Sequence, residues 1–73
     1  MVRIGVVDMD FSENLKSLRK EYRIDQAELA SELKVSPKTI SHWETGYTEP
    51  SVEQLVSLSK VFNVSLDELI LGK

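Results

Sequence analysis

Hydrogen-bonding side chains are concentrated in residues 36–47, SPKTISHWETGY. They carry hydroxyl, ammonium and imidazole groups, which can donate and accept hydrogen bonds to a bound partner. No nucleophile and base stand at a spacing that would pair them for catalysis. The chain has one histidine and no cysteine, so a closed tetrahedral zinc site is not expected, and we expect no other cofactor. These residues therefore indicate recognition of a partner, and we expect no enzymatic activity.

The composition is typical of one small folded domain. The chain has 73 residues, of which 41% are hydrophobic, and its formal net charge is −3. That apolar content is too high for a disordered tail, and a chain of this length has little room for a deep pocket beside its core. No apolar stretch approaches the roughly 18 residues that span a bilayer. We therefore expect a soluble, cytoplasmic domain with no membrane segment and no small-molecule ligand.

Hydrophobic periodicity and helix-start residues predict an all-α fold of five short helices. The first follows Ser12 and has apolar residues at i, i+3 and i+7. Ser36 and Pro37 start the third helix as N-cap and first residue, while Gly46 and Asn63 suit left-handed positions that end the third and fourth. The other three helices start with capping boxes, which are Asp25 with Glu28, Ser51 with Gln54, and Ser65 with Glu68.

The first ten residues differ from the rest of the chain. They are rich in valine and isoleucine, and these β-branched side chains favour extended backbone. We expect a short extended N-terminal arm over residues 1–10 and a helical domain over residues 11–73. Pairing of the arm as a β-strand with its copy in a second chain would cover its edges. A frayed terminus is the alternative.

The shared apolar core must supply most of the stability, because helices this short are marginal alone. We expect the core to contain Leu15, Leu18, Tyr22, Ile24, Ala27, Leu29, Ala30, Leu33, Val35, Ile40, Trp43, Val52, Leu55, Leu58, Phe62, Val64, Leu66 and Leu69.

Residues 26–46 have the layout of a helix-turn-helix. A turn of about three residues, 34–36, joins the two short helices, and the small side chain of Ala30 allows the second helix to cross close to the first. In this geometry the second helix projects from the domain and can enter a DNA major groove. The spacing alone does not distinguish this motif from another compact corner between two helices.

The motifs around this corner resemble the Cro/CI, or XRE, family of helix-turn-helix regulators, the phage-repressor-like DNA-binding domains. The resemblance covers residues 11–71 and implies a lambda-repressor-like fold, with the helix-turn-helix formed by helices two and three. It also implies a transcriptional regulator, on family grounds a repressor, that binds double-stranded operator DNA, usually as a homodimer. The matching residues are Leu15 and Arg19, QAELA at 26–30, the pattern VSxxTIxxWExG at 35–46, Pro50-Ser51, and NVSLDEL at 63–69.

The resemblance also assigns site residues. Gln26 matches a family glutamine that meets a phosphate at the positive end of the second helix, and Lys38 can pair with guanine O6 and N7. Arg19 and Glu44 match a pair that ties the first helix to the end of the third. We expect DNA contacts in the major groove and on the adjacent backbone from Gln26, Ser36, Pro37, Lys38, Thr39, Ser41, His42 and Tyr47.

A second hypothesis is a protein-interaction module, antitoxin-like or adaptor, on the same scaffold with weak or no DNA binding. The chain is acidic overall, whereas DNA binding draws most of its affinity from neutralised phosphates. Pro37 stands where many family members carry a base-reading polar side chain, and Tyr47 stands where they often carry a basic residue. Lys34 occupies a turn position that is commonly glycine, so a left-handed conformation there would be strained.

Overall fold

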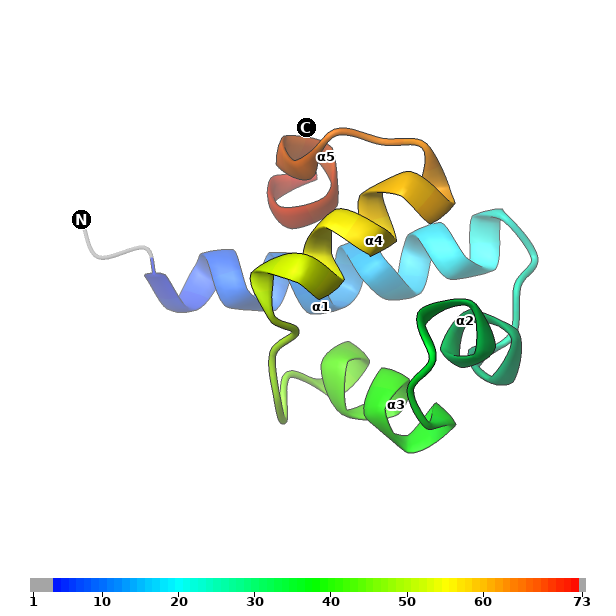
Figure 1. The fold of residues 1–73 in the computed structure, drawn as a ribbon. Coiled ribbons are helices and arrows are strands. Elements are labelled where there is room, and N and C mark those ends of the chain that lie inside the picture. The colour runs from blue at the N-terminus through cyan, green and yellow to red at the C-terminus, as the bar shows by residue number, and fades with distance from the viewer. Residues whose placement is uncertain (1–3, 73) are drawn as a thin grey trace.

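The computed structural model describes residues 4–72, and it describes the side chains of residues 11–72. Within this part of the chain it contains only helices and their connections, which confirms the predicted all-α class and the number of helices. Figure 1 shows α1 running through the middle, with α2 and α3 below it and α5 above it, and α1 packs against both α3 and α5. The five helices are α1 (Ile4–Glu21), α2 (Gln26–Leu33), α3 (Pro37–Thr45), α4 (Val52–Phe62) and α5 (Leu66–Leu71).

The extended N-terminal arm is the main error of the sequence prediction. The first helix was expected to start after Ser12, but α1 begins at Ile4, so residues 4–10 are helical. Elongating an existing helix adds one backbone hydrogen bond per residue, whereas a β-branched residue costs at most about 0.7 kcal/mol relative to alanine. Local preference was therefore too weak to stop the helix. Residues 1–3 lie outside the described part of the chain, and the domain boundary at residue 11 stays a prediction.

Helices α2 to α5 start at the residues that the sequence predicted. In the first capping box the Asp25 carboxylate accepts from the Glu28 amide at 2.8 Å, and the Glu28 carboxylate accepts from the Asp25 amide at 3.0 Å. Equivalent boxes start α4 at Ser51 and α5 at Ser65. Ser36 caps α3 by accepting from the Thr39 amide at 3.2 Å. Each cap contributes about 1 kcal/mol to helices too short to form alone.

Helices α1 to α4 all end in the same hydrogen-bond pattern, the Schellman motif. One residue has left-handed backbone angles, with φ near +55° to +80°. The amide of the residue after it donates to the carbonyl of the residue five positions earlier in the chain. At the end of α2, for example, the Val35 amide donates to the Ala30 carbonyl at 3.0 Å. The predictions for Gly46 and Asn63 are confirmed, as is the turn at residues 34–36. The left-handed residues are Arg23 (φ 58°), Lys34 (φ 59°), Gly46 (φ 80°) and Asn63 (φ 55°).

Replacing Lys34 with glycine is expected to stabilise the domain. Lys34 has φ 59° and ψ 44°, where a residue with a Cβ pays about 1–2 kcal/mol. Glycine relieves that strain but adds about 0.4–1 kcal/mol of unfolded-state entropy. The free energy of unfolding, measured with urea, should therefore rise by about 0.5–1 kcal/mol. Lys34→Ala removes the same charge but keeps the Cβ, so it is the control. A glycine variant no more stable than this alanine variant would contradict the prediction.

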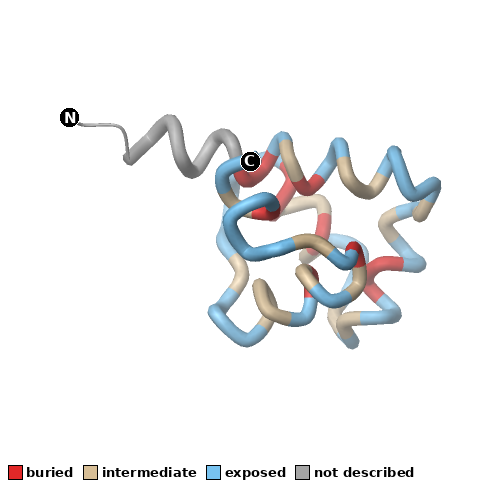
Figure 2. Tube along the Cα trace, turned by 90° about the horizontal axis from the view of Figure 1, so that it is seen from above, coloured by how far each residue is buried: buried red, intermediate tan, exposed pale blue. Residues whose placement is uncertain are grey.

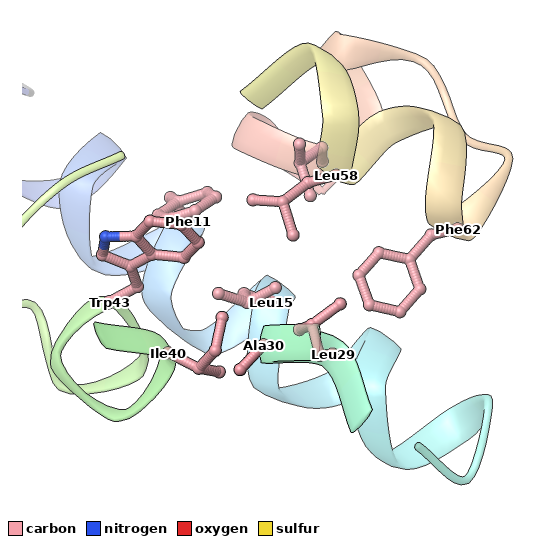
Figure 3. Close-up of a cluster of buried hydrophobic side chains, with 9 residues drawn as sticks. Phe11, Leu15, Leu29, Ala30, Ile40, Trp43, Leu58 and Phe62 are labelled. Carbon is pink, nitrogen blue, oxygen red and sulfur yellow. The ribbon is translucent and has the colours of Figure 1, made fainter. Parts of the chain in front are cut away.

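The core lies where the helices face one another. Figure 2 shows buried residues on the sides of the helices that face inward, and Figure 3 shows the buried apolar side chains pointing into the space between the helices. Half-buried apolar residues, among them Leu18, Ile24, Leu33, Val35 and Leu55, pack around this cluster. The buried apolar residues are Phe11, Leu15, Leu29, Ala30, Ile40, Trp43, Leu58, Phe62 and Leu69.

Four residues predicted for the core are exposed instead. Val52 and Leu66, 74% and 40% exposed, are the first residues of α4 and α5. Side chains at a helix start lean toward its N-terminus, beyond the part that packs. Ala27, in the first turn of α2, is also exposed. Tyr22 is 44% exposed, although its ring lies edge-on against Phe62 and its hydroxyl donates to the Phe62 carbonyl at 2.6 Å.

Phe11 is a core residue that the sequence prediction left out. Its side chain is 7% exposed and belongs to the buried apolar cluster. It had been placed at the start of the domain, before the first expected helix, whereas α1 contains it. Among the residues that the structure describes, no helix combines the length and the apolar character needed to cross a membrane.

Candidate nucleic-acid interface

The outward side of α3 carries four polar side chains. Ile40, Trp43 and Glu44 are buried and define the inward side of this helix. At 3.6 residues per turn, the opposite side contains Lys38, Ser41, His42 and Thr45. Lys38 and Thr45 are exposed, while Ser41 and His42 are half-buried. Thr45 was not predicted as a site residue, although its position seven residues after Lys38 places it on the same side.

The start of α3 is stabilised by hydroxyl groups. Ser36 accepts from the Thr39 amide, and its Oγ also lies 3.1 Å from Thr39 Oγ1. Both hydroxyls are therefore engaged in capping the helix. Pro37 and Lys38 are exposed beside them. The first turn of α3 contains no acidic residue, so no carboxylate offsets the positive end of its dipole. An anion can approach this helix end without repulsion from α3 itself.

A buried carboxylate connects the first three helices. Glu44 is 6% exposed; its Oε2 accepts from Arg19 Nε and its Oε1 from Arg19 Nη2 at 3.2 Å. Arg19 Nη1 also donates to the Ile24 carbonyl at 3.1 Å. Hydrogen bonding to Glu44 raises the pKa of the Arg19 guanidinium, so this residue stays positively charged. The ion pair expected between Arg19 and Glu44 is present, and it fixes α3 relative to α1.

Gln26 belongs to the same group of residues. Its Nε2 donates to Glu44 Oε1 at 3.0 Å, a contact that the sequence did not suggest. An amide nitrogen carries two hydrogens, so Gln26 keeps a second donor for a phosphate. The capping box also places the Asp25 and Glu28 carboxylates at this helix end. Their negative charges offset the positive end of the α2 dipole, so a phosphate at this helix end would need a donor such as the Gln26 side chain.

Tyr47 lies against the outward side of α3. The chain turns back at Gly46, and the Tyr47 ring then packs against the His42 imidazole with 4.7 Å between the ring centroids and 57° between the planes. Tyr47 is 76% exposed. The structure thus brings together Lys38, Ser41, His42, Thr45 and Tyr47 on one surface, while Gln26 lies at the start of α2. We call this surface the α3 face.

The α3 face has a simple charge distribution. Helix α3 contains two charged residues, Lys38 and Glu44. Because Glu44 is buried against Arg19, Lys38 is the charged side chain that α3 presents to solvent. Hydrogen-bond donors and acceptors make up most of the remaining face. A surface of this kind suits a polyanion recognised mainly through hydrogen bonds.

Comparisons with known proteins agree on one family. A sequence model described as helix-turn-helix matches residues 15–69. Over 65 residues the chain is 43% identical to the HTH-type transcriptional activator BcrR of Enterococcus faecalis, covering 89% of this chain and 32% of BcrR. The crystal structure of the P22 c2 repressor in complex with a synthetic operator is similar, with a TM-score of 0.81 and 40% identity, covering 86% of this chain and 96% of that chain.

An enzyme contains a similar domain. The hydroxypropylphosphonic acid epoxidase from S. wedmorenis matches with a TM-score of 0.80 and 34% identity, over 86% of this chain but only 34% of the epoxidase chain. The similarity is therefore confined to about a third of that enzyme. The chain also spans only part of its curated relatives, between 28% and 54% of the length of three of them.

Proposed function

The chain belongs to the helix-turn-helix family of Cro/CI, or XRE, regulators, and we propose that it regulates transcription by binding operator DNA with α3 in the major groove. One observation carries this proposal. Over 86% of its length the chain is similar to the P22 c2 repressor, which was solved in complex with a synthetic operator, and α3 presents a polar outward face. Second helices of such motifs bind in the major groove and contact base edges.

The residues proposed to contact DNA divide into two groups. Lys38, Ser41, His42 and Thr45 point outward along α3 and contact base edges, with Lys38 suited to guanine O6 and N7. Four other sequence-assigned residues contact the sugar–phosphate backbone, which sets the register of the helix on the duplex. These backbone contacts come from Gln26, Ser36, Pro37 and Thr39, while the Tyr47 ring lies against His42.

The proposed binding unit is a homodimer on a site with two half-sites. A single module of this size covers about 600–1,000 Å² and reads few base pairs. Two copies related by a two-fold axis would place their α3 helices one helical turn apart, about 34 Å, and double the contacts. Repression is the proposed effect, because occupying an operator requires only the α3 face, whereas activation requires a further surface for the transcription machinery. No catalytic step is assigned to these residues.

Replacing Lys38 with alanine is expected to weaken binding to a selected operator about tenfold. A base-contacting side chain contributes about 1–3 kcal/mol of binding free energy. Affinity would be measured by fluorescence anisotropy at fixed salt. Lys60→Ala is the matched control, because Lys60 is also exposed but lies on α4, outside the helix-turn-helix. The proposal requires Lys60→Ala to bind within about twofold of the original protein.

The same experiment distinguishes the protein-interaction alternative. A regulator binds operator DNA in a salt-dependent manner, because binding releases counterions from phosphates. Equal losses of operator affinity in Lys38→Ala and Lys60→Ala would show that affinity depends on net charge and not on the α3 face. If no DNA binding is detected at any salt concentration, a protein-interaction module on the same scaffold would be favoured.

A further inference from the structure

The end of α3 holds a contact that the roles assigned so far do not explain. The Tyr47 amide donates to the His42 carbonyl at 2.9 Å, and the two rings pack 4.7 Å apart. His42 and Tyr47 are therefore joined twice, through the backbone and through their side chains. His42 is on the α3 face, so whatever fixes its ring also fixes part of the proposed reading surface.

The other helix ends show what the residue in this position ordinarily does. In a Schellman motif the residue after the left-handed one often makes an apolar contact. At the ends of α1, α2 and α4 this residue is Ile24, Val35 or Val64, and each is half-buried against the core. At the end of α3 it is Tyr47, which is 76% exposed and contacts His42. Tyr47 therefore does not anchor α3 to the core.

An aromatic ring at this point restricts the His42 side chain. A free imidazole on a helix surface populates several rotamers, and binding must select one of them. Contact with the Tyr47 ring removes part of that freedom before DNA binds. We propose that Tyr47 is a positioning residue, which holds the His42 imidazole where it reads one base pair and so sets the base preference at that position. The inference rests on the proposed function.

The test compares base preferences rather than affinity alone. Binding of the full chain, of His42→Ala, of Tyr47→Ala and of Tyr47→Phe would be measured on a selected operator and on duplexes with each base pair replaced in turn. His42→Ala and Tyr47→Ala should each lose about five- to tenfold of discrimination at the same single position. Tyr47→Phe keeps the ring and should keep the preference. Combining the two alanine substitutions should add nothing further.

Two results would overturn the inference. If Tyr47→Ala weakens binding to every duplex equally, Tyr47 contacts the backbone or stabilises the fold and does not position His42. If Tyr47→Phe behaves like Tyr47→Ala, the phenol hydroxyl is the active group, as in a phosphate contact. Both Tyr47 variants should remain folded, because the Tyr47 side chain is exposed. The hydrogen bond that Tyr47 makes at the end of α3 comes from its backbone amide, which both variants keep.

A measurement without DNA separates this inference from the proposed function. The proton chemical shifts of the His42 ring should carry a ring-current shift from Tyr47 that Tyr47→Phe retains and Tyr47→Ala removes. Absence of that shift in the original protein would refute the positioning contact itself. If the shift is present but no duplex is selected, the proposed function fails. If a duplex is selected and Tyr47→Ala keeps the original preferences, only the positioning role fails.

Discussion

Replacing Glu44 with alanine is expected to lower the free energy of unfolding by about 3 kcal/mol. The substitution leaves the Arg19 side chain, 13% exposed, without its carboxylate. It also removes the acceptor of Gln26 Nε2. A buried charge that loses its partner is strongly destabilising, whereas the intact pair adds little over apolar residues of similar size. Urea unfolding followed by circular dichroism would measure the loss.

The control is the double variant Arg19→Met, Glu44→Leu. It replaces both charges with apolar side chains, so its stability should lie close to that of the original protein. DNA affinity should still fall, because Gln26 has lost the carboxylate that holds its side chain. A loss below about 1 kcal/mol in Glu44→Ala would mean that water replaces the carboxylate and that Arg19 is not effectively buried.

Replacing Trp43 with alanine is expected to cost about 3–5 kcal/mol. Trp43 is 2% exposed and packs in the central cluster. A domain of this size has a total stability of only about 4–11 kcal/mol, so the substitution should remove a large part of it. Thermal unfolding would show a large fall in midpoint.

Val52→Ala is the control for the tryptophan variant. The sequence pattern predicted both residues as core, but Val52 is 74% exposed. Its substitution should change stability by less than about 0.5 kcal/mol. Similar losses in the two variants would contradict the observed burial.

The helix boundaries that could be predicted from sequence depend on neighbouring residues. Asp25 and Glu28 exchange hydrogen bonds three residues apart, and Gly46 adopts a left-handed conformation without strain because it has no side chain. Such interactions are complete within one turn of helix. The prediction failed at the start of α1, where helix elongation outweighed the local preference of β-branched residues.

Side-chain contacts across the fold were harder to predict. The contact between Gln26 and Glu44 joins residues 18 positions apart, and it depends on how α2 and α3 cross. The exposure of Val52 depends on which neighbour covers the first turn of α4. The face of α3 could be predicted because a buried Ile40 and Trp43 determine its opposite side. The contact between the His42 and Tyr47 rings could not be predicted, because it depends on the path of the chain after Gly46.

The most direct test of α3 as a DNA-reading helix is selection of duplexes from a random pool by the 73-residue chain at low ionic strength. The recovered sequences should be related, with two inverted half-sites about 10 base pairs apart from centre to centre. Enrichment should be lost in Lys38→Ala but not in Lys60→Ala. A recovered pool that cannot be distinguished from the input, obtained with folded protein, would contradict the assignment of α3 as a DNA-reading helix.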